Sequence, residues 1–234
     1  MPLNYSKKLK TFSLLHPNNV TTFIDYFKYT FKNELKDCTS LLEIGCGTNS
    51  RATPFTHNLY SIGLDLHSPS LIKNKEKKYF SDYLVADITQ LPFKKNSFDV
   101  VVASDVIEHL SKPQGMTLLS DMEQISRKKT IIFTPNGFNS KHNLEDNNPL
   151  QIHKSGWITK EFSNQGYKVF GINGLLALRG EKSKPTIKPE FLGHFISKLT
   201  NRIVFHSPER AFHLLCIKNK KIQNPTSQYT QIFT

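Results

Sequence analysis

Leu41-Leu-Glu-Ile-Gly-Cys-Gly-Thr-Asn-Ser50 is a short apolar run that ends in a glycine-rich turn. A run of this kind, bounded by turn residues, is typical of a buried strand. Gly45 permits a tight turn after the strand, and Gly47 lets a ligand approach the backbone where the next helix begins. The stretch therefore predicts a strand whose carboxyl end faces a bound ligand.

After this stretch, short apolar runs alternate with helical patterns, which is typical of βα units around a parallel sheet. Asp99-Val-Val-Val-Ala103 is apolar on both faces, as a central parallel strand would be. We therefore expect an α/β fold with seven strands, at 40–44, 60–64, 83–86, 98–103, 130–134, 167–172 and 212–218. The expected helices between them are 70–78, 114–125 and 158–165.

We expect three parts along the chain. Residues 1–39 form an N-terminal helical cap, in which Asn18 or Asn19 begins a helix that runs to about Lys36. Residues 40–220 form the main domain, and residues 221–234 form a polar, frayed tail. Between the last two strands, residues 173–210 form a basic insertion.

The insertion contains an amphipathic helical pattern. One face of this helix carries His194, Lys198 and Arg202. The segment either packs its apolar face on the core, or contacts a membrane, or covers a substrate cleft. The apolar residues share the opposite face: Phe191, Leu192, Phe195, Ile196, Leu199 and Ile203.

Net charge is the outlier of the composition. The 234 residues hold 31 Lys and Arg against 19 Asp and Glu, a formal charge of +12. Such an excess suggests an anionic partner such as nucleic acid, an acidic membrane face or a phosphorylated substrate. Residues 41–150 are neutral, with 12 basic and 12 acidic side chains, whereas residues 151–234 hold 13 basic and 4 acidic ones. The charge therefore bears on docking or on the acceptor, and we expect peripheral contact with an acidic membrane through Lys182–Arg202.

Several classes of protein are excluded by composition. A hydrophobic fraction of 38% indicates a folded chain, and no apolar run approaches the roughly 20 residues that span a bilayer. Cys38, Cys46 and Cys216 have unrelated spacings, which excludes a disulfide framework and a metal knuckle. Met1–Lys10 lacks the pattern of a signal peptide, so we expect a cytoplasmic protein, with peripheral membrane association as an alternative.

Three successive strands are expected to end at a carboxylate: Glu43, Asp65 and Asp87. Asp65 follows Gly45 by 20 residues, the spacing at which an acidic side chain meets ribose hydroxyls. A dinucleotide would place its pyrophosphate on the turn, where Glu43 would oppose it. S-adenosylmethionine carries a sulfonium and an ammonium and no phosphate, so these carboxylates favour a methyl donor over a hydride carrier.

These segments resemble the class I S-adenosylmethionine-dependent methyltransferases, and more closely the methyltransferase type 11-like, small-molecule branch. The acidic–x–Gly–x–Gly core is present at 43–47, although the family's third glycine is replaced around Asn49-Ser50. Segments similar to the family's ribose-binding strand end, adenine-binding segment, and fourth strand with its exit helix follow in the family's order at 62–65, 85–93 and 97–110.

The resemblance implies a Rossmann-like sheet whose last strand is antiparallel, and S-adenosylmethionine as cofactor. Asp87 would accept a hydrogen bond from the adenine amino group, and Ile88 would pack on the ring. The helix at 19–36 and the insertion at 173–210 would cover the acceptor. The resemblance implies a cofactor cleft formed by Glu43, Gly45, Cys46, Gly47, Asp65, Leu66, Asp87, Ile88 and Ser104.

His153 is the leading candidate for a base or an acceptor-binding group, because a loop histidine near neutral pKa can deprotonate a hydroxyl. His109 is a second catalytic candidate, although a packing role is its default. Asp105-x-x-Glu108-His109 also resembles the metal cluster of some RNA 3′-terminal and quinone methyltransferases, with His142 or His153 as a fourth ligand. We nevertheless expect no metal, because most proteins with this turn hold none. Trp157 is expected to be a packed aromatic residue rather than a stacking platform for a ligand.

The expected function is methylation of a small-molecule, glycan or lipid-linked acceptor, with O-methylation favoured over N-methylation. An RNA methyltransferase is the first alternative, since the chain is basic, although it shows no alternation of basic and aromatic residues. A non-catalytic S-adenosylmethionine-binding protein that docks on acidic membranes is the second. A nicotinamide dehydrogenase is disfavoured, because Glu43 would oppose the pyrophosphate of its cofactor.

Overall fold

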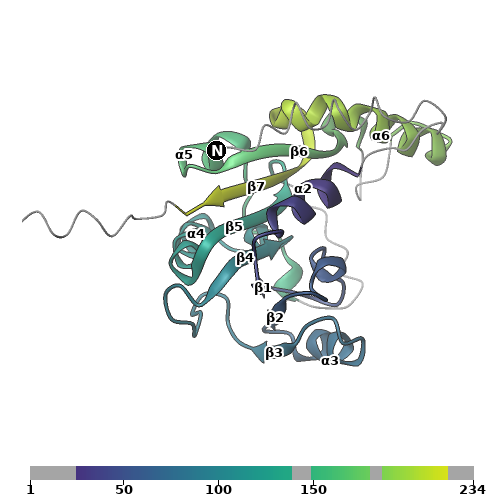
Figure 1. Ribbon diagram of the computed structural model, residues 1–234. Helices are drawn as coiled ribbons and strands as arrows, with labels where there is room; N and C mark the ends of the chain where they lie inside the picture. Colours follow the sequence, from purple (N-terminus) through teal and green to yellow (C-terminus); the bar gives the residue numbers. More distant parts are fainter. Residues whose placement is uncertain (1–24, 139–148, 180–185, 221–234) are drawn as a thin grey trace, which may run out of the picture.

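The structure is a computed structural model that describes residues 25–138, 149–179 and 186–220. Most of the expected N-terminal cap, the expected frayed tail and His142 lie outside the described residues. The described chain forms a seven-stranded sheet in the order β3-β2-β1-β4-β5-β7-β6 (Figure 1). The strands are β1 (Ser40–Ile44), β2 (Tyr60–Asp65), β3 (Asp82–Val85), β4 (Phe98–Ser104), β5 (Ser126–Pro135), β6 (Lys168–Leu175) and β7 (Ala211–Asn219).

Strands β1 to β5 are parallel, and β7 is antiparallel to both of its neighbours, β5 and β6. The expected fold, a mostly parallel Rossmann-like sheet with an antiparallel last strand, is confirmed. Ile44 at the end of β1 pairs with Leu64 of β2 and Ala103 of β4, so three carboxyl ends meet at one edge. Chain order reverses between β1 and β4, which is where ligands bind in open α/β sheets.

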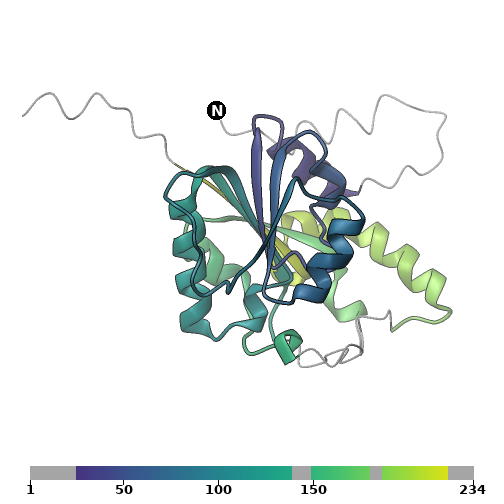
Figure 2. The same cartoon turned by 90° about the horizontal axis from the view of Figure 1, so that it is seen from below.

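Helices cover both faces of the sheet (Figure 2). Each face of the sheet has its own apolar core beneath these helices. One core includes Leu71 and Phe205, and the other includes Leu118 and Phe162. The first face carries α2 (Tyr26–Glu34), α3 (Ser68–Glu76) and α6 (Glu190–His206), and the second carries α4 (Lys112–Ile125) and α5 (Thr159–Asn164).

Helix α2 begins at Tyr26, whereas Asn18 and Asn19, where a helix was expected to begin, lie outside the described residues. Asp25 is the capping residue, and its Oδ1 accepts a hydrogen bond from the backbone N–H of Lys28 at 3.0 Å. Phe27 packs edge-on against Phe133 of β5, with ring centroids 5.3 Å apart. Helix α2 is therefore an integral part of the core.

Helix α6 packs on β6 through small residues. A Cβ atom at Gly171 would lie 2.1 Å from the carbonyl oxygen of Val204, and one at Gly174 would lie 2.7 Å from that of Ser197. Both glycines therefore let the helix backbone approach the strand closely. Ser197 and Val204 are buried by this contact.

The face of α6 that was expected to be apolar is exposed instead of packed on the core. Phe191, Leu192, Leu199 and Ile203 are all exposed, and so are Lys198 and Arg202. Lys198 and Arg202 follow Phe191 by seven and eleven residues, close to two and three helical turns. The cations therefore lie beside the apolar residues, and the prediction that they line the opposite face is wrong. Within the described residues, no helix is long and apolar enough to cross a membrane.

Candidate functional site

A cavity of about 550 Å³ opens at the carboxyl ends of β1, β2 and β4. Of the nine residues predicted to form the cofactor cleft, Glu43 alone does not line it. The structure thus brings together residues from four separate stretches of chain. The lining residues that were predicted are Gly45, Cys46, Gly47, Asp65, Leu66, Asp87, Ile88 and Ser104.

The glycine turn forms the floor of this cavity. Gly45 and Gly47 both have positive φ, at 65° and 52°, a conformation that side chains disfavour. A Cβ atom at Gly45 would also lie 2.5 Å from Val106, whereas the space at Gly47 is open. The Asn74 side-chain amide, fully buried on α3, donates a hydrogen bond to the carbonyl of Gly47. The hydrogen bond from Asn74 thus fixes the turn, and the backbone of Gly47 stays open to a ligand.

Asp65 at the end of β2 joins the turn to the next helix. One carboxylate oxygen accepts from the backbone N–H of Gly47 and the other from that of His67, both at 2.8 Å. A carboxylate has about four acceptor positions, so Asp65 can accept two further hydrogen bonds from ligand hydroxyls. Asp87 also lines the cavity, and one of its oxygens accepts hydrogen bonds from Thr89, which leaves the second oxygen available to a ligand.

Glu43 lies behind the cavity lining and is fully buried. Burial raises the pKa of this carboxyl to about 8, while the hydroxyls of Ser50 and Ser104 oppose that shift. Glu43 is therefore mostly protonated at neutral pH. The carboxylates that give the cavity its negative charge are Asp65 and Asp87, so the electrostatic preference for a cationic ligand rests on them.

An ion pair closes the other side of the cavity. Arg51 Nε lies 3.1 Å from Asp105 Oδ2, and the Arg51 guanidinium stacks 4.1 Å from the ring centroid of Phe133. Asp105 adopts a positive φ of 53°, a rare conformation for a residue that is not glycine and one that clusters at functional sites. Burial raises the pKa of Asp105, and Arg51 opposes the shift.

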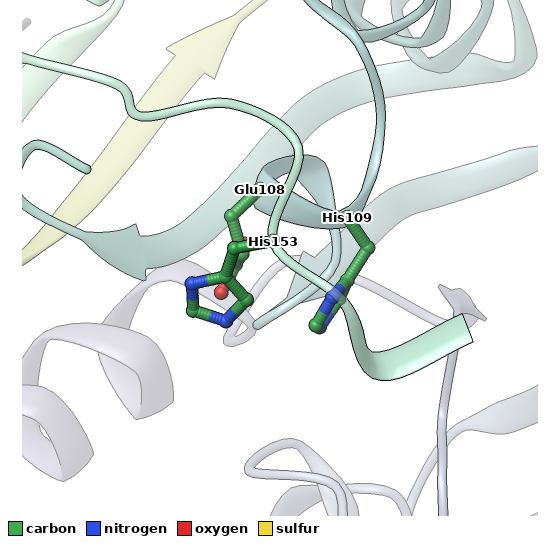
Figure 3. Close-up of side chains that lie close together, drawn as sticks. All are labelled: Glu108, His109 and His153. Carbon is green, nitrogen blue, oxygen red and sulfur yellow. The ribbon is translucent and has the colours of Figure 1, made fainter. Parts of the chain in front are cut away.

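Glu108, His109 and His153 converge beside this cavity (Figure 3). The structure offers one ligand atom from each side chain, all within 4.8 Å of one another. The two imidazole rings meet edge to face, with centroids 4.9 Å apart. Burial raises the pKa of Glu108 to about 8, and the charge of Asp105 adds to the shift. Glu108 Oε2 accepts a hydrogen bond from Thr134 Oγ1 at 2.9 Å.

The backbone explains why residues 44 positions apart meet here. The N–H groups of Lys154 and Ser155 donate to the carbonyl of Glu108 at 2.8 and 3.1 Å, which clamps the later segment onto the turn after β4. His109 Nδ1 lies 3.3 Å from the carbonyl of Ile152. His109 lines the cavity, whereas His153 does not line it and contacts the ring of His109 instead.

This group could hold a divalent cation, since one carboxylate and two imidazoles are ordinary ligands. Asp105, the first residue of the motif that resembles a metal cluster, contributes no atom to the group and is paired with Arg51 instead. The expectation that no metal is present stays a prediction.

The described parts of α2 and α6 contribute no residue to the cavity lining, and their expected role as covers of the acceptor stays a prediction. Trp157 is buried, as expected, and its indole N–H donates to Ser155 at 2.9 Å.

Three residues at or beneath the cavity were not predicted from the sequence. Asn74 looks like any polar residue of α3, and Arg51 and Lys154 like solvated loop cations, yet Arg51 and Lys154 line the cavity. Arg51 could have been suspected from its place just after the glycine turn.

Comparisons with known proteins agree with this geometry. A family model described as "Methyltransferase domain" matches residues 42–134, which run from β1 to the end of β5. An uncharacterised protein of Methanocaldococcus jannaschii is 29% identical over 142 residues, and the match covers 59% of this chain and 59% of the relative.

Solved structures share the fold. A SAM-dependent methyltransferase from Archaeoglobus fulgidus is similar with a TM-score of 0.52 and 20% identity, over 82% of this chain and 94% of that one. A putative sarcosine dimethylglycine methyltransferase from Galdieria sulphuraria has a TM-score of 0.53 and 13% identity, over 83% of each chain.

Proposed function

We propose that this chain, whose residues 42–134 match a methyltransferase-domain model, is a class I S-adenosylmethionine-dependent methyltransferase that methylates a hydroxyl of a small-molecule, glycan or lipid-linked acceptor. The observation that carries the choice of a hydroxyl is His109, an imidazole on the cavity wall backed by Glu108 and His153. A hydroxyl must lose a proton during methyl transfer, and a positioned imidazole accepts one.

The residues present fit the cofactor. Gly47 offers open backbone, and Asp65 and Asp87 keep free acceptor positions. Bound S-adenosylmethionine supplies an activated methyl group. Asp65 would hold the ribose hydroxyls, Asp87 the adenine amino group, and Ile88 would pack on the ring.

His109 is placed to act on the acceptor. An imidazole with its proton on Nδ1 donates to the carbonyl of Ile152 and leaves Nε2 as an acceptor toward the cavity. Glu108 and His153 lie beside His109, and the ring of His153 meets that of His109 edge to face, so both restrict the orientation of the imidazole. His153, the leading candidate on sequence grounds, thus supports His109, which contacts the acceptor.

The acceptor class can be identified with S-adenosylmethionine labelled in its methyl group. The protein is incubated with this donor and a cell extract, and RNA, lipid, glycan and small-metabolite fractions are separated. We expect label in the lipid, glycan or small-metabolite fraction. Label in RNA, with an affinity for RNA that falls steeply with salt, would support the RNA methyltransferase instead.

The role of His109 is tested by His109→Asn, whose amide can keep the hydrogen bond to Ile152 but cannot take a proton. We expect methyl transfer to fall by a factor of about 10² to 10⁴ while cofactor affinity stays within about twofold. Because an exposed imidazole far from the cavity should not matter, His206→Asn is the control. An unchanged rate in His109→Asn would remove His109 from the chemistry.

A further inference from the structure

Helix α6 presents an apolar face that no described part of the chain covers. Phe191 is 74% exposed, Leu199 52% and Ile203 56%, and Leu192 lies on the same face. Large apolar side chains gathered on one exposed face mark an interaction site rather than ordinary surface. The helix keeps its place without this face, because Ser197 and Val204 pack on β6 through the glycines of that strand.

Cations border the same face. Lys198 and Arg202 are exposed and lie close to the row of Phe191 along the helix, and Lys188, also exposed, precedes the capping residue Pro189. Long basic side chains beside an apolar stripe can keep their charges at a headgroup layer while the apolar residues enter it. The chemistry of the face therefore matches a surface that is apolar inside and anionic outside.

The orientation of α6 connects this face with the cavity. Strand β6 runs parallel to β5, because both are antiparallel to β7. Val204 of the helix meets Gly171, and Ser197 meets Gly174 near the strand's end, so the residues before Ser197 extend past the carboxyl end of β6. The cavity opens at that same edge of the sheet, and the helix projects there in Figure 2.

We propose that the exposed face of α6, formed by Phe191, Leu192, Lys198, Leu199, Arg202 and Ile203, docks on an anionic membrane surface. Of these residues, Phe191 and Leu192 lie on the part of the helix that extends past the carboxyl end of β6, so docking brings the cavity's edge of the sheet near the bilayer. The docking itself is independent of the proposed function. That a membrane presents the acceptor rests on the proposed function.

Two other occupants fit less well. In a two-fold contact between copies of this chain, the same patch faces itself, so Lys198 and Arg202 would meet like charges. A lid over the cavity is also disfavoured, because none of the described residues of α6 lines it.

Flotation with lipid vesicles tests the docking without any methyl transfer. We expect the full chain to float with vesicles of phosphatidylcholine and phosphatidylglycerol and to remain at the bottom of the gradient with vesicles of phosphatidylcholine alone. Binding to the anionic vesicles should weaken as the salt concentration rises. Phe191→Ser with Leu199→Ser should weaken binding at least about tenfold, because less apolar area enters the interface. Lys198→Gln and Arg202→Gln should each weaken it about fivefold.

Ile72→Ser is the matched control, since Ile72 is 60% exposed on α3, away from α6, and its loss should leave binding unchanged. Circular dichroism shows that each variant is folded. The proposal is overturned if the folded wild-type chain does not float with anionic vesicles, as it would if another segment covered this face. It is equally overturned if Phe191→Ser with Leu199→Ser floats like wild type, or if sedimentation shows a dimer that these two substitutions dissociate.

Discussion

Asp65 both holds the glycine turn and lines the cavity. Its two oxygens hold the N–H groups of Gly47 and His67, and the same carboxylate lines the cavity. Its place was predicted by its spacing from Gly45, because residues that end neighbouring parallel strands meet at one edge of the sheet. The ion pair of Arg51 with Asp105 could not be predicted, since it depends on the path of the loop after Gly47.

Asp65→Asn should weaken the binding of S-adenosylhomocysteine by at least about tenfold, because the ribose hydroxyls lose a charged acceptor. Isothermal titration calorimetry measures this. Asp82→Asn is the control, because Asp82 is an exposed carboxylate at the start of β3 that binds Tyr60. If Asp65→Asn binds as wild type does, Asp65 does not contact the cofactor.

Glu43 predicts a pH dependence of stability. Its pKa is about 8 in the folded chain against 4.5 for an ordinary glutamate, so the folded state keeps a proton that the unfolded state loses. The stability that the retained proton on Glu43 contributes is fully present below pH 4.5. It is lost as the pH rises through the folded-state pKa of about 8. Glu43→Gln should therefore be more stable than wild type at pH 9, by up to about 4 kcal/mol, with a smaller gain at pH 5.

Urea unfolding at both pH values measures the effect. The exposed Glu76→Gln on α3 is the control and should show no such dependence. An equal effect of Glu43→Gln at pH 5 and pH 9 would contradict the raised pKa.

At the scale of elements, periodicity predicted the strands well and misjudged α6. Strand β1 has the predicted bounds, Ser40–Ile44, because its apolar run is short and ends at glycine. The apolar stripe of α6 indicated the wrong packing face, since the strand contact uses Gly171 and small helix residues, which a count of apolar residues overlooks. Strand β5 begins four residues earlier than expected, at Ser126, because its first residues are polar.

Gly171→Ala tests this close packing. The added Cβ would lie 2.1 Å from the carbonyl of Val204 and 2.6 Å from Ala211 Cβ, so the helix backbone must move. Overpacking of this kind costs about 1–3 kcal/mol. The melting temperature should fall by roughly 2–10 °C in differential scanning calorimetry. Ser163→Ala, an exposed substitution on α5, should leave it unchanged, and a Gly171→Ala variant as stable as wild type would contradict the contact.

At the scale of the whole molecule, the excess of basic residues lies in a different part of the chain from most of the cavity lining. The stretch 41–150, which forms most of the cavity, is neutral, and the excess of basic residues follows it in sequence. Within that later part, Lys198 and Arg202 lie on the helix that projects past the cavity's edge of the sheet. This separation agrees with the proposal that the net charge of +12 serves docking rather than cofactor binding.

Titration of the wild-type chain with S-adenosylhomocysteine, followed by calorimetry, tests the central claim that the cavity at the ends of β1, β2 and β4 holds the methyl donor. One molecule should bind per chain, with a dissociation constant in the micromolar range or below, about −8 kcal/mol or stronger. A folded chain that takes up no S-adenosylhomocysteine at millimolar concentration would contradict the claim.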